Sequence, residues 1–385
     1  MKINVCNVDE EGRFGGPERR IVLVAKALKQ HNIDTHVVYP KCDSDKFSQE
    51  LSRAGISSSA LNITRLSKEK KILARYVFCF FIEIFRLFIF FRRHNFDLIH
   101  VNGSYQFKVA LAGRLAGIPV IWHLNDTKMD MIVKKICLFI SKYCASGFIV
   151  TGKKVYEYYI RGTSLEKKPH FEIQVPVETT VFDPSHATPD KRVSQAHGRK
   201  IVTVSGINPI KGLEFFIKMA SNLARYHSDL VFFVAGAEFS SQKTYYEYIK
   251  DLVASSNLTD KNFKFVGMID NVPAFLQSAD IFVFTSVSES GPATVWEAMS
   301  MGKAIVSTDV GSVSEYIEDG VSGFIAPIRD VGALCEKVEF LLENPDLRQK
   351  MGEKARIIAQ KNLDVSLAAQ KHAYFYRKIL SLRFQ

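Results

Sequence analysis

The sequence predicts an α/β protein of two domains, each built on a parallel sheet. The main observation is a unit of strand, loop and helix: an apolar, β-branched run at Ile281–Thr285, a turn-rich loop at Ser286–Pro292 and a helix at Ala293–Met301. A second such unit follows at once, and its helix is expected to close at Gly320. The second observation is length, because 385 residues are enough for two cores. Ligands of open α/β sheets bind at the loops that follow the strands.

Composition and cysteine usage describe an ordinary globular protein. Hydrophobic residues make up 47% and charged residues 24%, which excludes a disordered chain or a fibre. The amino terminus, MKINVCNVDEEG, reads as a strand and an acidic turn without the pattern of a secretory signal. The six cysteines show no Cys-x-x-Cys spacing, so we expect no metal or redox role and a reduced, cytoplasmic setting.

Positive charge is concentrated in the first half of the chain. Residues 1–185 hold 28 Lys+Arg against 18 Asp+Glu, a net +10, and the remainder holds 23 against 22, a net +1. This asymmetry predicts that the first half contacts something anionic, either nucleic acid or an anionic membrane leaflet. No nucleic-acid-binding motif accompanies the charge, so we favour the membrane.

The amino-terminal segment also predicts a strand, a glycine-containing loop and a helix. The loop contains Gly15 and Gly16, and the helix is expected over Ile21–Leu28. Glycines let the backbone approach a bound phosphate closely, and a helix start favours an anion. On its own this loop is weak evidence, because most Gly-Gly pairs are only turns.

The segment Lys68–Arg93 is unusually apolar for a soluble helix. Between Tyr76 and Phe91 only Glu83 and Arg86 are polar. At 100° per residue, one narrow stripe holds Lys68, Lys71, Arg75, Cys79, Glu83, Arg86 and Arg93. Two interpretations remain open: a helix buried against the first sheet, or an interfacial helix lying in an anionic leaflet, and both can hold on opposite sides. The apolar run is shorter than the roughly 20 residues of a membrane span.

Two further strands of the first domain end in polar side chains. They are expected at Asn95–Gly103 and Ile118–Asp126, followed by a helix over Met131–Cys144. The polar side chains at the two strand ends are His100, Asn102, His123, Asn125 and Asp126. A linker is expected near Val175–Pro184.

The second domain opens with a strand, a loop and a helix over Lys200–Ala220. Ser205 ends the strand, and Lys211 and Gly212 stand at the helix start, where an ammonium can reach a diphosphate. Beyond Asn344 the chain reads as helical to its end.

Two acids flank the loop and the helix start of the opening unit. Glu289 lies in the loop and Glu297 about one turn into the helix. Carboxylates accept hydrogen bonds from hydroxyls, as of a ribose or sugar, and the helix start between them favours a phosphate. Either acid alone would most simply be an ordinary solvated residue. Together with the glycine-rich unit that follows, they predict a nucleotide-sugar site.

The stretch from Glu289 to Phe324 resembles the signature of glycosyltransferase family 4, which comprises retaining enzymes of GT-B fold that use nucleotide-activated sugars. Other positions that match the family pattern are Gly15, Gly16, Glu18, Lys211, Gly302, Gly311, Glu315, Gly320 and Gly323. Pro292 departs from it, since the family often has Gly there, and proline removes a backbone donor. The family's arginine before Lys211 is also missing, because Gly206 or Ile207 stands in its place.

The resemblance implies a GT-B fold, with two Rossmann-like domains facing across a cleft and a C-terminal helix that crosses back to the first. Residues 1–183, with 363–385 packing on them, would bind the acceptor, and residues 184–362 would bind the nucleotide sugar. The implied activity is retaining transfer of a hexose from a nucleotide-diphosphate sugar to a glycan or lipid-linked acceptor, in cell-surface polysaccharide or glycolipid synthesis. The cysteine usage, the charge asymmetry and the apolar segment, taken with this activity, predict an enzyme in the cytoplasm that is peripheral to the membrane through residues 68–93.

The resemblance also implies roles for individual residues. The catalytic set is Glu289, Lys211 and His123, with Asn125 as the alternative to His123. The donor-binding set is Gly15, Gly16, Ser205, Lys211, Glu289, Ser290, Gly291, Pro292, Ala293, Thr294 and Glu297. The acceptor-side set is Glu18, His100, Asn102, Asn125 and Asp126. No metal or cofactor is expected, because Lys211 and the amides after Glu289 would take the place of Mg²⁺.

Three other functions remain as alternatives. A GT-B epimerase would form product from the nucleotide sugar alone. A catalytically degenerate, membrane-recruited partner would bind a donor without turnover, and Pro292 and the missing arginine favour it. A basic nucleic-acid binder, the weakest alternative, would bind RNA or DNA with a steep salt dependence.

Overall fold

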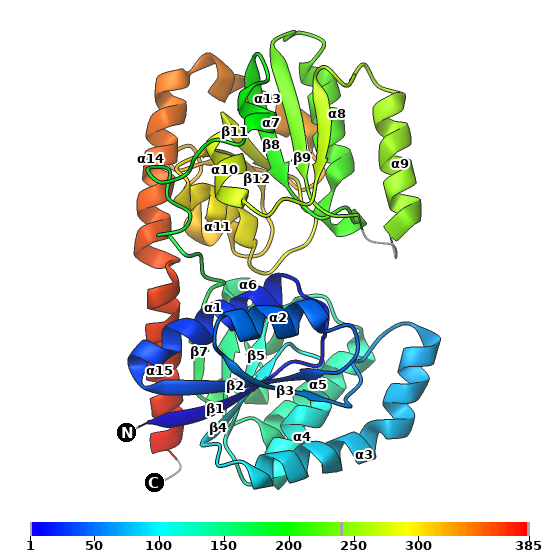
Figure 1. Cartoon of the computed structure of the whole chain (residues 1–385), viewed down its shortest axis with the longest axis vertical. Helices are drawn as coiled ribbons and strands as arrows, with labels where there is room; N and C mark the ends of the chain where they lie inside the picture. The colour runs from blue at the N-terminus through cyan, green and yellow to red at the C-terminus, as the bar shows by residue number, and fades with distance from the viewer. Residues whose placement is uncertain (1, 239–241, 383–385) are drawn as a thin grey trace. The chain divides into compact units, whose positions relative to one another are not determined.

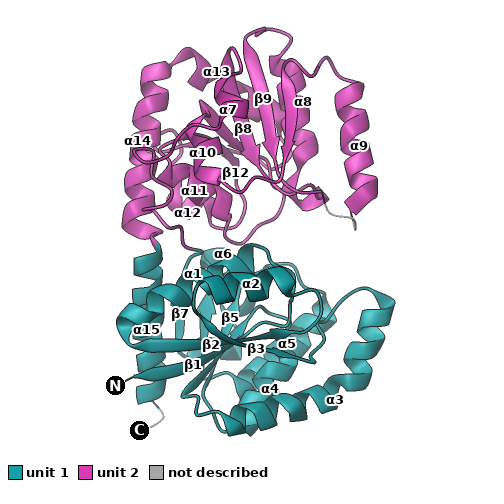
Figure 2. Ribbon diagram, viewed as in Figure 1, with its two compact units in different colours: residues 1–175, 365–385 teal, residues 176–364 magenta. Residues whose placement is uncertain are grey.

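The computed structural model describes residues 2–238 and 242–382 and divides into two compact units (Figure 2). Unit 1 holds the residues up to Val175 and those from Val365, and unit 2 is Pro176–Asp364. The chain therefore returns to unit 1 after completing unit 2. The break lies before the domain boundary expected from the sequence, because Phe182 and Asp183 are tied into unit 2. The Ser300 hydroxyl donates to the Phe182 carbonyl at 2.7 Å, and Arg356 pairs with Asp183 at 2.9 Å.

Unit 1 is built on a sheet in which seven parallel strands of the described chain run in the order β3-β2-β1-β4-β5-β6-β7 (Figure 1). The strands are β1 (Ile3–Val8), β2 (Ile33–Pro40), β3 (Ser57–Leu61), β4 (Leu98–Asn102), β5 (Val120–Leu124), β6 (Gly147–Val150) and β7 (His170–Glu172). The strands β4, β5 and β6 are buried along their whole length, as expected for a parallel sheet covered on both faces.

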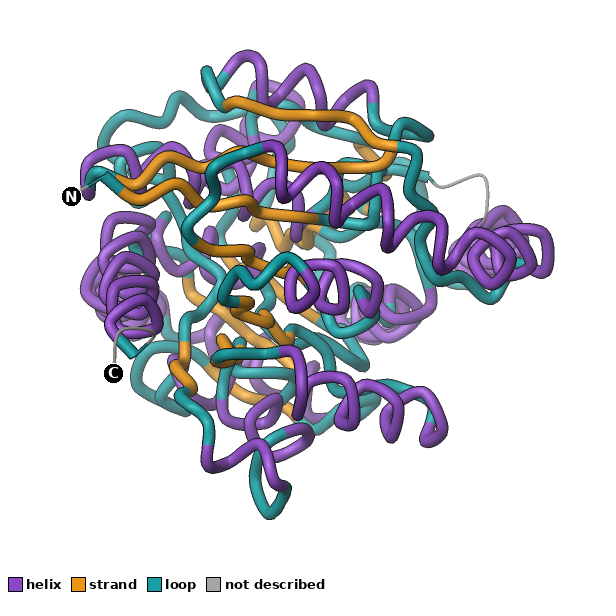
Figure 3. Tube along the Cα trace, turned by 90° about the horizontal axis from the view of Figure 1, so that it is seen from below, coloured by secondary structure: helices purple, strands orange, loops and turns teal. Residues whose placement is uncertain are grey.

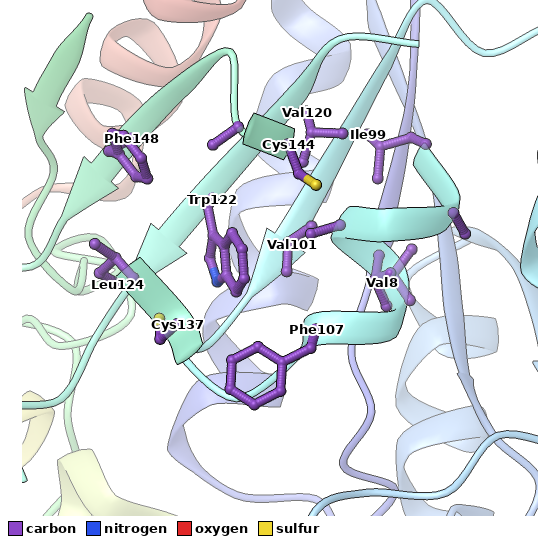
Figure 4. Packing of buried hydrophobic residues seen from close by; sticks show 14 of the residues in the cluster. Val8, Ile99, Val101, Phe107, Val120, Trp122, Leu124, Cys137, Cys144 and Phe148 are labelled. Atoms are coloured by element: carbon purple, nitrogen blue, oxygen red, sulfur yellow. The ribbon is translucent and has the colours of Figure 1, made fainter. Parts of the chain in front are cut away.

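Helices cover both faces of this sheet (Figure 3). They are α1 (Gly16–Leu28), α2 (Asp45–Arg53), α3 (Lys70–Arg93), α4 (Phe107–Leu115), α5 (Met131–Cys144), α6 (Lys153–Tyr159) and α15 (Val365–Ser381), with 3₁₀ turns η1 (Lys29–His31) and η2 (Ser164–Lys167). One core lies between the strands and the helices α4 and α5, where Trp122 and Phe148 are fully buried (Figure 4). The other packs α1 and α15 on the opposite face, so the carboxyl-terminal helix is part of the core of unit 1.

Unit 2 has a sheet in which six described parallel strands run in the order β10-β9-β8-β11-β12-β13. The strands are β8 (Arg199–Val204), β9 (Leu230–Ala235), β10 (Phe263–Gly267), β11 (Ile281–Phe284), β12 (Ala304–Thr308) and β13 (Phe324–Ala326). The helices are α7 (Lys191–Ser194), α8 (Leu213–Leu223), α9 (Lys243–Ala254), α10 (Val272–Gln277), α11 (Ala293–Ser300), α12 (Val313–Tyr316), α13 (Val331–Glu343) and α14 (Pro345–Asn362), with the 3₁₀ turn η3 (Pro209–Lys211). In this order β8 and β11 are neighbours, so the loops that follow them lie side by side.

The apolar segment of unit 1 forms one long helix, α3, which is buried on one side. Glu83 is 1% exposed and faces the core, where it pairs at 2.5 Å with the fully buried Lys108 of α4. On the other side, Phe78 is 83% and Phe81 79% exposed. The polar stripe predicted from the sequence therefore includes an inward-facing residue, and large aromatic rings face outward. Among the described residues, no helix has the length and apolar character needed to cross a bilayer.

Two local features differ from the sequence-based expectation. Helix α2 and strand β3 lie in the polar stretch after Lys41, in which the sequence indicates no elements; β3 is serine-rich and lacks an apolar pattern. The helix expected to close at Gly320 ends at Tyr316 instead. Beyond it, the Glu318 amide donates to the Ser322 hydroxyl at 2.9 Å, and this turn takes the place of further helix.

Candidate functional site

In unit 2, the turn between β8 and α8 presents Lys211. Ser205 is buried directly after β8, and the Asn208 side chain accepts from the Ile210 amide at 3.1 Å, which starts the 3₁₀ turn. Gly212 has a φ of 60°, in the left-handed region, and a Cβ there would collide with the Thr285 carbonyl oxygen. Glycine at this position therefore lets the Lys211 turn pack against the end of β11.

The loop after β11 is bound to the Lys211 turn. The Val287 amide donates to the Ile210 carbonyl at 2.8 Å. Glu289 accepts from the Ser286 hydroxyl at 3.0 Å and forms a salt bridge with the Lys211 ammonium. Both charged side chains keep partial exposure, 28% for Lys211 and 17% for Glu289. The two loops thus hold a cation and an anion in contact at the carboxyl edge of the sheet.

The same loop is fixed from its other side by the unit that follows β12. The Ser290 carbonyl accepts from the amide and from the hydroxyl of Ser312, each at 3.1 Å. Gly311 has a φ of 54°, and a Cβ at this position would collide with the Ser290 carbonyl. The Thr308 hydroxyl donates to the Ser286 carbonyl at 2.6 Å. The loop that follows β11 is therefore held between the Lys211–Gly212 turn and the segment that follows β12.

Helix α11 begins directly after this loop. Pro292 is its N-cap, and the Val295 amide donates to the Pro292 carbonyl at 3.0 Å. The first amides of a helix have no intrahelical acceptor, so those of Ala293 and Thr294 give this end a partial positive charge. Glu297 is 4% exposed on the same helix. The site of unit 2 therefore combines an ammonium, a helix start and two carboxylates, a set suited to a diphosphate that carries hydroxyls.

In unit 1, Gly15 is the N-cap of α1 at the end of the loop after β1, and Gly16 and Glu18 lie in the first turn of the helix. Glu18, in the first turn of α1, accepts from the Gly15 amide at 2.7 Å and caps the helix. Burial raises the pKa of its carboxyl to about 8. A Cβ at Gly16 would meet nothing within 4 Å, so neither the fold of unit 1 nor backbone strain requires glycine there.

Below this loop lies a chain of buried hydrogen bonds that starts at Arg20. Its guanidinium lies 2.9 Å from His123 Nε2, His123 Nδ1 lies 3.2 Å from His100 Nε2, and His100 Nδ1 lies 2.5 Å from the Tyr376 hydroxyl. Burial lowers the pKa of both histidines well below their ordinary value, so both are neutral. Because arginine only donates, each imidazole accepts through Nε2 and carries its proton on Nδ1.

His372 of α15 completes a group of three buried imidazoles. Ring nitrogens of His100, His123 and His372 lie within 4.8 Å of one another, a spacing that three metal ligands can share. The neighbouring Arg20 guanidinium would repel a cation, and His372 Nδ1 already donates to the Ala368 carbonyl at 2.7 Å. The arrangement therefore fits a hydrogen-bond chain better than a metal centre.

The remaining polar residues predicted for the acceptor side lie around this chain. Asn102 accepts from Arg20 at 2.8 Å and donates to Asn7. Asp126 accepts from the Tyr159 hydroxyl at 2.8 Å, and burial raises the pKa of its carboxyl. Asn125 is partly exposed at the end of β5, whereas His123 is 1% exposed.

The structure brings the predicted residues together in two groups, one in each unit. Sequence reasoning missed several members of the unit 1 group: Asp9, Glu10, Arg20, Gln106, His372 and Tyr376. Arg20 follows the Gly-Gly loop closely, but its sequence neighbours do not show that its side chain points inward. His372 and Tyr376 lie four residues apart on one face of a helix, and that spacing was the one available signal.

Comparisons with known proteins bear on both units. Residues 14–168 match the family model described as Glycosyltransferase Family 4, and residues 187–357 match the one described as Glycosyl transferases group 1. The first match falls in unit 1 and the second in unit 2.

Similar proteins include an alpha-D-kanosaminyltransferase of Streptomyces kanamyceticus, 28% identical over 46% of this chain and 45% of the relative. A second is an N,N'-diacetylbacillosaminyl-diphospho-undecaprenol alpha-1,3-N-acetylgalactosaminyltransferase of Campylobacter jejuni, 33% identical over 30% of this chain and 31% of the relative. The chain thus matches less than half the length of these two relatives. Among solved structures, Anabaena HepE in complex with UDP has a TM-score of 0.82 at 19% identity, covering 98% of this chain and 100% of that chain. This likeness shows the fold, which is GT-B.

Proposed function

The chain belongs to the glycosyltransferases of group 1 and family 4, whose models match both of its units, and from this premise we propose that it transfers a sugar from a nucleotide-diphosphate sugar to an acceptor. The observation that carries the proposal is the contact of Lys211 with Glu289 beside the start of α11. The ammonium and the amides of this helix would bind the diphosphate, and Glu297 would accept from the ribose hydroxyls.

Departure of the nucleoside diphosphate is the step that these groups would assist. When the bond between the sugar carbon and the β-phosphate oxygen breaks, negative charge grows on that oxygen. Once the diphosphate has replaced Glu289 as a partner of Lys211, this ammonium and the helix dipole would stabilise the growing charge. Glu289 would accept from the hydroxyls of the donor sugar and fix its orientation, and binding of the diphosphate would replace part of its contact with Lys211.

The stereochemical course we propose is retention, carried over from the family. The acceptor hydroxyl would attack from the face that the phosphate leaves, and the departing phosphate would take the hydroxyl proton. No metal is required in this scheme, because Lys211 and the amides of α11 supply the positive charge.

In unit 1, the neutral histidine chain would act as a rigid support for the acceptor side. Both ring nitrogens of His123 are engaged in hydrogen bonds, so the ring would position its strand end and would not exchange a proton with substrate. Asn125, partly exposed two residues later, offers an amide that a substrate hydroxyl can reach. Of the two alternatives at this strand end, the geometry favours Asn125 for substrate contact.

The acceptor would be a glycan or a lipid-linked sugar at the cytoplasmic face of a membrane. One observation supports a membrane surface: α3 and α5, which both pack against α4, carry exposed apolar side chains. These include Leu73, Val77, Phe78, Phe81, Ile82 and Phe85 on α3 and Met131, Ile132, Ile136, Phe139 and Tyr143 on α5. Lysines accompany them on both helices and arginines on α3, as expected for a surface that lies on an anionic leaflet.

Vesicle flotation tests this surface. The combined change Phe78→Ser, Phe81→Ser and Phe85→Ser should weaken binding to phosphatidylglycerol vesicles about 100-fold or more, because three exposed rings lose their burial in lipid. The matched control is Tyr226→Ser, Met268→Ser and Ile357→Ser, three exposed apolar residues of unit 2. Equal flotation of the two variants would remove the membrane from the proposal.

Turnover is tested with a panel of nucleotide sugars in the presence of EDTA. Slow release of nucleoside diphosphate from one donor, with the sugar first appearing as the α or β anomer that the donor carried, would support a metal-independent, retaining transferase. Donor binding without release would favour the degenerate partner instead. Formation of an epimeric nucleotide sugar would favour the epimerase.

A further inference from the structure

Glu289 uses one carboxylate oxygen for both of its contacts in the structure. Its Oε1 accepts from the Lys211 ammonium and, at 3.0 Å, from the Ser286 hydroxyl. That hydroxyl also lies 3.0 Å from the Ile210 carbonyl, and its single hydrogen serves only one acceptor at full strength. The other oxygen, Oε2, forms no hydrogen bond among the described residues and is not buried. Lys211 is therefore the main partner of this carboxylate, and Oε2 is open to a ligand.

Lys211 is also the one cation in the loops around this carboxylate. The loops after β8, β11 and β12 (residues 205–212, 285–292 and 309–312) contain a single lysine or arginine, Lys211. The arginine that the family carries before this lysine is missing. A diphosphate that binds at the start of α11 and the carboxylate of Glu289 therefore compete for the same ammonium.

The partner of Glu289 depends on which ligand is bound. A nucleotide sugar brings two replacements, because its diphosphate takes Lys211 and a hydroxyl of its sugar donates to Oε2 of Glu289. The nucleoside diphosphate that remains after transfer still takes Lys211, but it no longer carries the sugar. Glu289 then keeps only the hydrogen that Ser286 shares and part of its hydration. A largely buried carboxylate without its main partner raises the free energy of this product complex.

The product also carries more negative charge than the donor. Its terminal phosphate is no longer esterified by the sugar, so above about pH 6 it bears one further negative charge. This charge would lie beside Lys211, the residue that Glu289 contacts in the structure. Like charges repel most strongly at short range, so the carboxylate disfavours the product more than it disfavours the donor.

We propose that Glu289 discriminates between donor and product through its exchange of Lys211. It tolerates the nucleotide sugar, which replaces the ammonium with a hydroxyl, and it promotes release of the nucleoside diphosphate, which replaces the ammonium with nothing. Release begins when Glu289 recovers Lys211 from the terminal phosphate. The inference rests on the proposed transferase function and adds product release to the same site. It also separates Glu289 from Glu297, whose ribose contact is the same in donor and product.

Calorimetric titration with matched ligands tests this role. The ligands are UDP with UDP-glucose, UDP with UDP-N-acetylglucosamine, and GDP with GDP-mannose, in EDTA at about pH 7.5, where the terminal phosphate is ionised. Glu289→Gln keeps the size of the side chain and removes its charge. We expect the Kd of the nucleoside diphosphate to fall about tenfold or more, because the product complex no longer holds an unpaired carboxylate. The Kd of the matching nucleotide sugar should fall less, or rise, because its sugar loses a charged acceptor.

Glu336→Gln is the matched control, since it removes the same charge from the exposed surface of α13 in unit 2 and should change neither Kd. An unchanged or higher Kd of the nucleoside diphosphate in Glu289→Gln would show that Glu289 only orients the sugar, and would overturn the proposal. An equal gain for both ligands would reduce the effect to general repulsion of anions and overturn it as well. A parent chain that binds no ligand of the panel would overturn the transferase assignment itself, which distinguishes that failure from a failure of this inference.

Discussion

The two units place charged groups at the carboxyl edges of their sheets in different ways. In unit 2, Lys211 and Glu289 lie in neighbouring loops, remain partly exposed and pair with each other. In unit 1, Arg20, His100 and His123 are almost fully buried, and they meet Tyr376 of the carboxyl-terminal helix. An exposed pair can exchange its partner for a ligand at low cost, whereas a buried chain holds its geometry. The comparison indicates that Lys211 of unit 2 can exchange Glu289 for the anion of a ligand, whereas the buried chain of unit 1 keeps one fixed arrangement.

The largest effect should come from breaking the buried charges of unit 1. Lys108→Met leaves Glu83 and Glu10 without their cation, and removal of one partner of a buried pair costs about 3–5 kcal/mol of the free energy of unfolding. Urea unfolding, read by hydrogen exchange in peptides of unit 1, measures the loss. The double change Lys108→Met with Glu83→Gln should recover part of it. An unchanged midpoint in Lys108→Met would show that the charges of unit 1 are not structural.

The same kind of change in unit 2 should affect ligand binding and leave stability nearly unchanged. Lys211→Ala removes a partly exposed cation, so we expect a nucleoside diphosphate to bind about 100-fold more weakly, the effect of losing a charge-assisted hydrogen bond of ~2–3 kcal/mol. Lys211→Arg, which keeps the charge, is the control. Isothermal titration with UDP and GDP measures the affinities. A drop in the unfolding midpoint as large as that of Lys108→Met would erase the difference between the units.

The stability of unit 1 should also depend on pH. Burial raises the pKa of Glu10 to about 7 and that of Glu18 to about 8. As the pH rises, these acids keep their protons in the folded chain after the unfolded chain has lost them. Their contribution to the free energy of unfolding is therefore full below the pKa of the unfolded state, and it is lost as the pH rises to the pKa of the folded state. The buried histidines, whose pKa values are lowered, have the opposite effect, but only below about pH 6.5.

Between pH 6.5 and 8 the free energy of unfolding of unit 1 should therefore fall with rising pH, by at most about 1.4 kcal/mol per pH unit for each acid. Urea midpoints across this range measure the slope. Glu18→Gln should flatten it, and Glu214→Gln in unit 2 is the control. A free energy of unfolding that rises with pH, or a slope that Glu18→Gln leaves unchanged, would contradict the assigned cause.

A smaller loss of stability than that of Lys108→Met should come from the far end of the histidine chain. Tyr376→Phe removes the group to which His100 donates and should cost about 1–3 kcal/mol, the penalty for a buried donor left unpaired. The ¹⁵N chemical shifts of the imidazoles provide the sharper readout. In the parent chain they should report protons on Nδ1 of both His100 and His123. Protonation of Nε2 on either ring would refute the chain that starts at Arg20.

The sequence predicted the fold of both units well because parallel strands leave strong local signals. The apolar run Ile281–Thr285 is buried in the sheet. Gly212 and Gly311 lie where a Cβ would collide with a backbone carbonyl, so both positions require glycine. Lys211 and Glu289 could be assigned to one site from the family resemblance, whereas their salt bridge with each other was not predicted. Strand β3 was missed because its serines carry no apolar periodicity.

The buried groups of unit 1 could not be predicted in the same way. The partner of Glu83 is Lys108 on another helix, and Arg20 reaches His123 across 103 positions of the chain. The sequence shows these residues as polar positions in apolar surroundings, but it does not show which of them face one another. The outward aromatic face of α3 was likewise ambiguous, because an almost wholly apolar helix does not show which side the sheet covers.

The central claim is that unit 2 holds a nucleotide-diphosphate sugar through the residues around α11. Its most direct test is calorimetric titration of the whole chain with a panel of nucleotide sugars in EDTA, comparing the parent chain with Glu297→Gln. The account predicts that the parent binds at least one donor and that the variant binds it about tenfold to 100-fold more weakly, since a buried carboxylate loses its bonds to the ribose. Equal donor affinity in parent and variant, or binding of no donor by the parent, would contradict it.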